Sequence, residues 1–207
     1  MLLSDIIKQA AAGIKDRECV VIPPLEWMEI FAWEIQNLYP DVYYSSTKEI
    51  DPTTLTDSYV VDLSSETGLR TISDILFELE AGNQIPYDTW YFDAATKKLY
   101  LSPLTFKKEI LDARSAKKIL INWKGIHPAI TNLGQTVSLN FEGIELLQSA
   151  AKKEVLKRIM FDSVKLDRYR TLIGDVNIYA LLALERQVNL EMELQKRKTR
   201  EADIGTF

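Results

Sequence analysis

The chain has little of the side-chain chemistry on which most metal sites and covalent catalysts rest. Its 207 residues include one cysteine, Cys19, and one histidine, His127. A single cysteine cannot form an internal disulfide, and one cysteine with one histidine cannot supply the ligands of a structural zinc site. We therefore expect a protein that needs no metal and no cofactor and that is kept in a reducing compartment.

The segments that direct a protein into or across a membrane are also missing from the sequence. The N-terminus has no basic start and no long apolar stretch, so it does not look like a secretory signal peptide. No run approaches the roughly 20 consecutive apolar residues that a membrane helix needs. These features predict a cytoplasmic protein with no membrane partner.

Motifs of common enzyme classes are absent as well. The sequence contains neither type of glycine-rich phosphate loop and no Gly-x-Ser-x-Gly nucleophile turn. His127 could serve as a general base or a metal ligand, but no nucleophile or ligand cluster stands near it, which favours a loop residue bonded to backbone. Glu142 and Glu145 are expected to be solvated on one helix face. Without a larger cluster of acids for carboxylate catalysis, we predict that the protein is not an enzyme.

The composition is that of a folded domain with a slight acidic excess. Hydrophobic residues make up 46% and charged residues 27%, which excludes wholesale disorder and a collagen-like repeat. There are 25 Lys and Arg against 30 Asp and Glu, a formal net charge of −5. Because sequence-independent affinity for phosphate rests on Lys and Arg, the chain as a whole is not expected to wrap nucleic acid. Any basic contact must be local.

Apolar residues recur at three- and four-residue steps near both ends of the chain, which is typical of amphipathic helices. Ser4 and Asp175 are the expected N-caps of two of these helices, and Pro24 is expected in the first turn of another. On the second helix, Trp27, Phe31 and Ile35 should face the C-terminal helices. The predicted helices span residues 4–12, 25–38 and 141–161, with a last helix after Gly174-Asp175.

Short runs of β-branched and aromatic residues predict strands in the middle of the chain. These runs lie at 42–44, 59–63, 75–79, 90–93, 99–101 and 119–123. The predicted fold class is α+β, mainly α, with a helical bundle of N- and C-terminal helices and a β-rich insertion. The expected parts are N-terminal helices at 1–41, the insertion at 42–124, a C-terminal helical pair at 125–198 that packs with 1–41 as one domain, and an extended docking tail at 199–207.

Aromatic side chains gather in the predicted hairpin of the insertion. Trp90, Tyr91, Phe92 and Tyr100 could form a platform on which nucleic-acid bases stack. Alternation along a strand, however, turns about half of the side chains inward. A core role is therefore favoured over base stacking.

The C-terminus carries the candidate partner-docking residues, which are Lys196, Arg197, Lys198, Arg200, Ile204 and Phe207. The four basic residues could simply favour the negative end of a helix dipole. That interpretation does not explain the two isolated apolar residues that follow. A tail with such spaced anchors is suited to ordering on a neighbouring molecule.

Three groups of segments follow one another along the chain: Trp27–Trp33 with Tyr39-Pro40, Trp90–Asp93 followed by Leu99–Leu101, and Ile121–Gly125 leading into Ile126–Leu133. In the last group, a strand leads through a Pro-containing loop into the C-terminal helices. The order of these segments resembles that of the head-to-tail connector, or portal adaptor, proteins of short-tailed bacteriophages. The resemblance covers nearly the whole chain as a layout, without an invariant catalytic motif.

The resemblance implies a structural virion protein. Adaptors of this family form a ring, typically of twelve subunits, beneath the portal, where the ring extends the DNA channel toward the tail. The implied partners are the portal ring, further tail proteins and copies of the chain itself, while DNA passes through without sequence-specific contact. The implied location is the head-tail interface of the virion, and the host cytoplasm during assembly.

The residues also leave a second interpretation open. The chain could be an intracellular interaction or regulatory module, in which the paired helices dimerise and the β unit binds a peptide or a single strand of nucleic acid. An adaptor is expected to stay largely monomeric until it meets a preformed ring. A regulatory module should be a stable low-order oligomer by itself.

Overall fold

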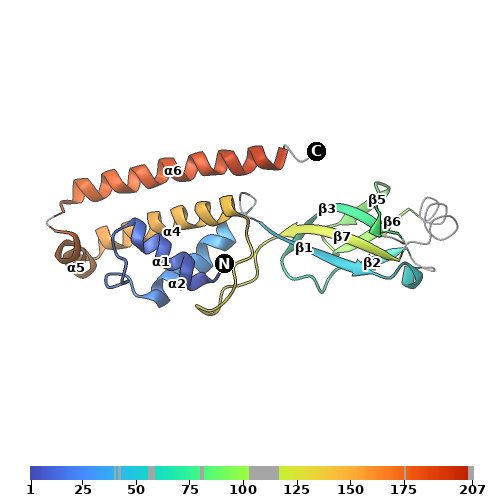
Figure 1. The fold of residues 1–207 in the computed structure, drawn as a ribbon, viewed down its shortest axis with the longest axis horizontal. Coiled ribbons are helices and arrows are strands. Elements are labelled where there is room, and N and C mark those ends of the chain that lie inside the picture. Colours follow the sequence, from blue (N-terminus) through green and yellow to red (C-terminus); the bar gives the residue numbers. More distant parts are fainter. Residues whose placement is uncertain are drawn as a thin grey trace. The chain divides into compact units, whose positions relative to one another are not determined.

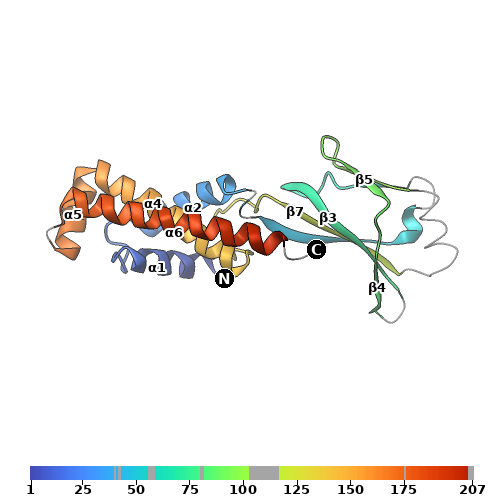
Figure 2. The ribbon, with the colours of Figure 1, turned by 90° about the horizontal axis from the view of Figure 1, so that it is seen from above.

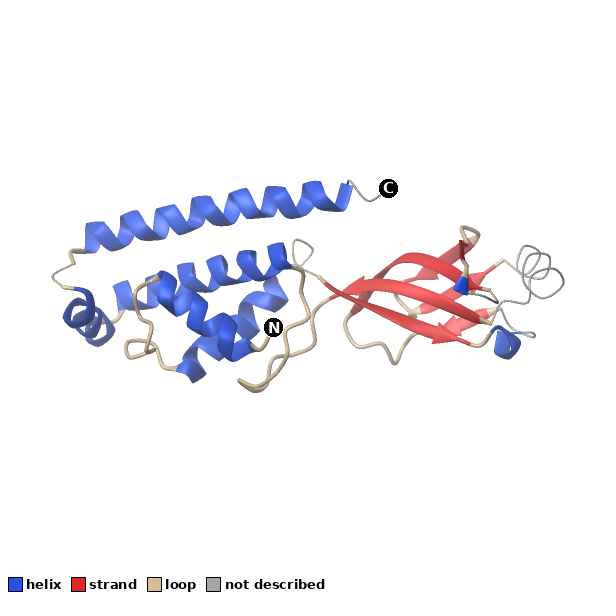
Figure 3. Cartoon of the chain, viewed as in Figure 1, coloured by secondary structure: helices blue, strands red, loops and turns tan. Residues whose placement is uncertain are grey.

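The computed structural model describes residues 1–39, 41, 43–55, 59–79, 82–102, 117–174 and 176–204, and of residues 199–204 it describes the backbone. The chain divides into two compact units. One comprises residues 1–43 and 129–207, and the other comprises residues 44–128. Helices make up the first unit and strands most of the second (Figures 1 and 3), so the fold is α+β and mainly α, as predicted.

In the helical unit, α4 is the central element and packs against every other helix that the structure describes there (Figures 1 and 2). Ten of its residues are buried. The predicted apolar face is confirmed, with Ile144, Val155 and Ile159 all buried. The helices are α1 (Leu3–Gly13), α2 (Pro24–Asn37), α4 (Phe141–Phe161), α5 (Ser163–Ile173) and α6 (Ile178–Ile204).

Helix α2 places its large apolar side chains in this core. Trp27 and Phe31 are fully buried and Ile35 is nearly so, and the two aromatic rings lie 6.0 Å apart. Pro24 occupies the first turn, as predicted, because its missing N–H has no helical partner there. The predicted face of α2 is therefore confirmed as core.

The prediction that Ser4 caps the first helix is wrong. Helix α1 begins at Leu3 after an N-cap at Leu2, and no side chain caps it. Instead, the N–H of Leu3 donates to the carbonyl of Gln135 at 2.9 Å, and the N–H of Ser4 donates to that of Leu133 at 3.1 Å. Backbone from the loop before α4 thus satisfies donors that a cap would otherwise satisfy.

The loop between α1 and α2 is held from within by one carboxylate. Asp16 is fully buried, and its two oxygens accept hydrogen bonds from the N–H groups of Val20, Val21 and Ile22 at 2.8, 3.2 and 3.1 Å. Cys19 in the same loop has a φ of 50°, a conformation that non-glycine residues rarely adopt. The carboxylate therefore fixes a turn that the backbone alone would not favour.

The region after α4 contains a helix that the sequence did not predict. Helix α5 begins after Asp162, whose side chain accepts from the N–H groups of Val164 and Lys165. The expected cap of the last helix, Asp175, lies outside the described residues. Asn177 has this role, because its side-chain oxygen accepts from the N–H of Ala180 at 2.9 Å.

The prediction of an extended segment at 199–207 is wrong for residues 199–204. Helix α6 continues to Ile204. The residues after Leu194 include Gln, Lys, Arg, Glu and Ala, all strong helix formers, so the backbone has no reason to leave the helix where the apolar periodicity ends. Residues 205–207 lie outside the described part of the chain.

The second unit is built from two antiparallel sheets. One sheet has the order β1-β7-β3-β4 and the other β2-β6-β5. Residues from both sheets belong to one buried cluster that includes Ile75, Leu99, Ile121 and Trp123. The strands are β1 (Tyr44–Ile50), β2 (Val60–Asp62), β3 (Leu69–Glu78), β4 (Gln84–Pro86), β5 (Trp90–Asp93), β6 (Lys98–Leu101) and β7 (Lys118–Gly125), and a short 3-10 helix, η1, spans Pro52–Leu55.

The predicted hairpin at 90–101 is present as β5 and β6, and the strand predicted at 119–123 lies within β7. Two other strands differ from the prediction. The strand expected at 42–44 begins at Tyr44 and continues to Ile50, and the one expected at 75–79 begins earlier, at Leu69. Both extensions pair with β7, so long-range pairing rather than local composition sets their length.

Chain entry and exit meet at one end of this unit. Tyr44 pairs with Gly125 across β1 and β7. A Cβ atom on Gly125 would lie 2.2 Å from the carbonyl oxygen of Gly68, so only glycine allows the backbones of the two residues to approach this closely. The two connections to the helical unit thus leave from neighbouring positions.

Glu34 gives the helical unit a testable pH dependence. Burial raises the pKa of its carboxyl, as does Glu154, against the opposing effects of Lys153, Lys157 and Lys196. Because the folded-state pKa is raised, the contribution of Glu34 to stability is fully present at pH values below the ordinary pKa of a glutamate carboxyl, where the side chain is protonated. This contribution is lost as the pH rises through the raised pKa and the buried carboxyl ionises. We expect Glu34→Gln to be more stable than the wild type at pH 7 and equal to it at pH 4. Urea unfolding at several pH values measures this difference, and a variant less stable at pH 7 would contradict it.

Candidate functional site

Helix α6 carries two apolar faces, and the fold covers one of them. Leu181, Val188 and Met192 are buried, and this face packs against α4. Leu190 and Leu194, in contrast, are 67% and 58% exposed. Since a surface helix needs a single apolar face to pack on its own core, the second face requires a separate explanation.

The exposed apolar residues lie in a row. Leu182, Leu190 and Leu194 are spaced by multiples of four, with Arg186 at the remaining position, and residues four apart lie on the same side of a helix. We call these four residues the α6 outer row. Leu182 is 36% exposed, and Tyr179, one turn before it, is 80% exposed. Isolated exposed leucines are common on protein surfaces, but several exposed apolar residues on the same side of one helix are typical of an interface.

The predicted basic docking residues follow this row, and those whose side chains the structure describes do not share one surface. Lys196 turns toward its own unit, where its ammonium lies 3.3 Å from Glu193 and influences buried Glu34. Arg197 and Lys198 are exposed. Arg200 and Ile204 are on the helix, but their side chains, like all of Phe207, lie outside the described residues.

The helix dipole does not account for the basic residues. Its effect is confined to about the last turn of a helix. Because α6 runs on to Ile204, its last turn contains no basic residue. The interpretation of Lys196, Arg197 and Lys198 as dipole-stabilising charges is therefore wrong, since it assumed a helix that ended sooner.

On the β5–β6 hairpin, two of the four aromatic residues face outward. Tyr91 and Tyr100 are 66% and 39% exposed, with ring centroids 6.1 Å apart, whereas Trp90 and Phe92 pack against the core. The tyrosines border a shallow hollow of about 390 Å³. Among the described residues, its lining includes Asp88 and no Lys or Arg, so none of these residues attracts phosphate.

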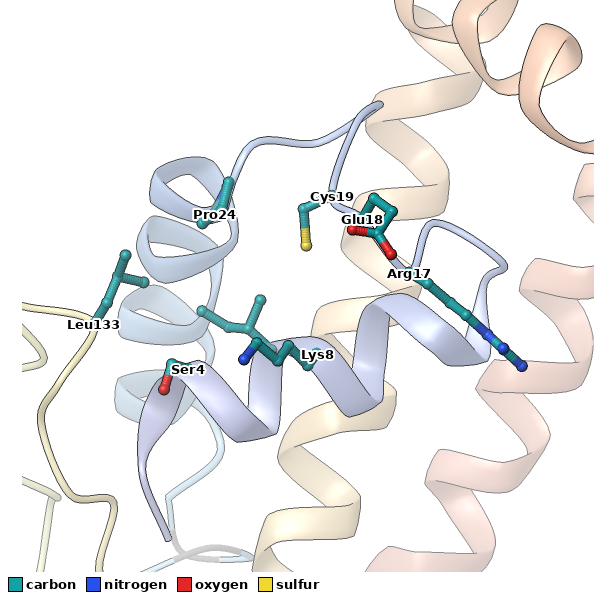
Figure 4. Close-up of a pocket in the computed structure, with 8 residues that line it drawn as sticks. Ser4, Lys8, Arg17, Glu18, Cys19, Pro24 and Leu133 are labelled. Carbon is teal, nitrogen blue, oxygen red and sulfur yellow. The ribbon is translucent and has the colours of Figure 1, made fainter.

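A smaller pocket of about 300 Å³ lies beside the α1–α2 loop (Figure 4). Cys19 and Lys8 point into it from different segments, whereas the guanidinium of Arg17 points away. Burial raises the pKa of the Cys19 thiol, and the carboxylates of Asp16 and Glu18 raise it further. The thiol is therefore protonated at neutral pH, and the thiolate needed for nucleophilic chemistry is not favoured.

His127 has the surroundings of a structural loop residue. The side chain is 4% exposed, its Nδ1 lies 2.8 Å from the carbonyl oxygen of Pro128, and its ring packs against Tyr44 at 5.6 Å. Burial lowers the pKa of the imidazole, so the ring is neutral at pH 7. These contacts agree with the interpretation of His127 as a loop residue bonded to backbone.

Within the part of the chain that the structure describes, no three His, Cys, Asp or Glu side chains gather as metal ligands would. None of its helices combines the length and the apolar character that crossing a bilayer requires. Among the features found, the α6 outer row is the strongest candidate for a functional surface.

A comparison with protein-family models finds no match for the chain, and a comparison with curated proteins finds none either.

Proposed function

We propose that the protein is a structural virion component, a head-tail connector that forms a ring beneath the portal, extends the DNA channel and links the capsid to the tail. The observation that carries the proposal is α6, which leaves a row of apolar side chains uncovered along its outer side. A helix of this kind is suited to a protein whose surface is completed by neighbouring molecules. The layout of helices around a β-rich insertion, which resembles that of portal adaptors, supports the same function.

The charge balance is compatible with a channel for DNA. Twelve copies at −5 each would carry a charge of −60. A like-charged ring does not hold DNA as it passes during genome ejection.

Labelling of virions tests the proposal. Gold-conjugated antibodies against this chain should mark a single site per particle, at the head-tail junction, in electron micrographs of the phage that encodes it. Particles labelled elsewhere, or virions free of the protein, would contradict the proposal. An antibody against the major capsid protein provides the control for accessibility.

The second candidate function is an intracellular dimeric interaction module with a peptide- or nucleic-acid-binding β unit. The exposed Tyr91–Tyr100 pair is the observation that favours it. Light scattering of the isolated protein separates the two functions at micromolar concentration. A largely monomeric chain is expected of the connector, and a stable dimer of the module.

Truncation of the C-terminus tests where the connector meets the portal. Among the described side chains of α6, the last buried apolar residue is Met192, so deleting residues 199–207 should change the melting temperature by less than about 2 °C. Binding to the portal ring should be lost. Arg200→Glu should weaken that binding most at low salt, because charges at the rim of an interface are screened by salt.

Two outcomes of the truncation would oppose a docking role for the C-terminal end. If the shortened chain bound the portal ring normally, residues 199–207 would not be the contact. If the shortened chain failed to fold, these residues would belong to the core. Arg168→Glu, an equivalent reversal at an exposed position of α5, is the matched control for Arg200→Glu.

A further inference from the structure

We propose that the α6 outer row of one copy of the chain packs onto the outer side of α2 of a second copy, in a head-to-tail contact. The proposal rests on the proposed ring function for its biological role. Its physical basis is a match between two rows of side chains on different helices of the same unit. In this contact, the exposed α6 outer row is covered by another copy of this chain.

The second row lies on α2. Leu25 and Trp33 are 62% and 59% exposed, and Glu29 between them is exposed as well. These residues, at steps of four, form what we call the α2 outer row. The opposite side of the helix supplies core residues such as Trp27 and Phe31. Helix α2, like α6, therefore has an apolar side that its own unit leaves uncovered.

The two rows match in spacing and in charge. On α2 the order is Leu25, Glu29 and Trp33, and on α6 it is Leu182, Arg186 and Leu190. Each series places a charge midway between apolar residues that are eight positions, or about 12 Å, apart. The central charges are opposite in sign, so they meet whether the helices run parallel or antiparallel. Residues at steps of four also form ridges along a helix. The commonest packing of two helices interdigitates such ridges, with an angle of about −50° between the two helix axes.

Among the residues that the structure describes, the central charges have no competing partner, since neither Glu29 nor Arg186 has an ion-pair partner within 4 Å. Glu26, one turn earlier on α2, is by contrast engaged in its own unit, where Lys165 and Arg158 donate to it at 2.6 and 3.2 Å. Glu29 is thus an acidic group left for an external cation, and Arg186 is a cation left for an external acid.

A symmetric contact between two α6 rows fits less well. An antiparallel pair centred on Arg186 would bring this residue against its own copy, and like charges in an interface are destabilising, whereas a pair centred on the four-residue row would place Arg186 against Leu190 and leave it without an acidic partner. Packing α6 on α2 avoids this repulsion. In Figure 1, α6 lies above α4, and α1 and α2 lie below it, so α6 and α2 are different helices packed on different sides of α4. A contact between two different surfaces repeats from copy to copy, and it closes into a ring if the rotation permits.

Charge exchange between full-length chains tests the contact. We expect sedimentation velocity of the wild type to show association that increases with concentration from micromolar to about millimolar. Arg186→Glu alone and Glu29→Arg alone should each lower the association constant by about tenfold or more. An equimolar mixture of the two variants should regain association, since every contact in an alternating assembly then joins opposite charges. Arg168→Glu on α5 is the control and should associate as the wild type does.

Each outcome bears on the proposal. A wild type that stays monomeric up to millimolar concentration would overturn it, as would normal association of both single variants or failure of their mixture to recover. If only Arg186→Glu has an effect, the α6 row binds a surface other than α2, and the proposal is wrong. Virion labelling remains separate: unlabelled virions with a successful charge exchange would refute the connector function and leave the contact standing.

Discussion

Phe31→Ala is expected to lower the free energy of unfolding of the helical unit by about 3–5 kcal/mol. Phe31 is fully buried on α2, packs against Trp27, and lies in the cluster that α4 completes. Removing the ring deletes its buried surface and leaves a cavity that neighbouring backbone cannot fill without shifting. Urea unfolding followed by far-ultraviolet circular dichroism measures the loss.

The neighbouring aromatic residue of the same helix provides the control. Trp33 is 59% exposed, so Trp33→Ala in dilute protein should change the free energy of unfolding by less than about 0.5 kcal/mol. Comparison of Phe31→Ala with Trp33→Ala separates the effect of burial on stability from the effects of aromatic character and helix propensity. A cost below about 0.5 kcal/mol for Phe31→Ala would show that this face of α2 is not part of the core.

Asp16→Ala is the second substitution with a large expected effect, a loss of about 3 kcal/mol or more. The carboxylate accepts from three backbone N–H groups, of which those of Val21 and Ile22 are in buried bonds. Alanine would leave all three donors without their acceptor. It would also release a loop in which Cys19 is held at positive φ.

Asp16→Asn separates the hydrogen bonds from the charge. Its single amide oxygen can still accept one or two of the three bonds, so the loss should be smaller than with alanine. Amide hydrogen exchange at Val20, Val21 and Ile22 is the second measurement, and it should accelerate in both variants. Unchanged exchange at these amides would refute the role of Asp16 even if the variant were less stable.

Elements with a strong local pattern were predictable from the sequence. Helix α4 has the bounds that its apolar periodicity indicated, since Asn140 caps it and ten of its residues find a core. The β5–β6 hairpin is marked by aromatic strands around a polar turn. Helix α5 was missed because only Leu166 and Tyr169 of its residues are buried, which is too few to produce a periodicity.

Other features depend on partners that are distant in the sequence. Strand β1 has the polar sequence Ser45–Glu49 at its centre, and it forms because β7, whose residues lie 69 to 81 positions after their partners, supplies its ladder of hydrogen bonds. The start of α1 is likewise completed by the carbonyls of Leu133 and Gln135. No local pattern contains this information.

The candidate surface was only partly visible in the sequence for a similar reason. The leucines of α6 are recognisable as helical, but the sequence does not say which of two apolar sides α4 will cover. Leu190 and Val188 are two positions apart, and only the packing shows that Val188 is buried while Leu190 is exposed. The four-residue spacing from Leu182 to Leu194, with a charge inside it, was the available signal for a second face.

Along the sequence, the β unit is inserted between two parts of the helical unit, and this order has a consequence for biosynthesis. Helices α1 and α2 leave the ribosome before α4, the helix that covers them, which ends at Phe161. The 118 residues from Tyr44 to Phe161 take roughly 6–24 s to synthesise at about 5–20 residues per second. The β unit can complete its sheets during this interval, because all of its strands precede α4. Until α4 has been synthesised, the side chains of Trp27, Phe31 and Ile6, which are buried in the folded protein, remain exposed to solvent. Nascent chains of this protein should therefore depend on chaperones most strongly before α4 emerges.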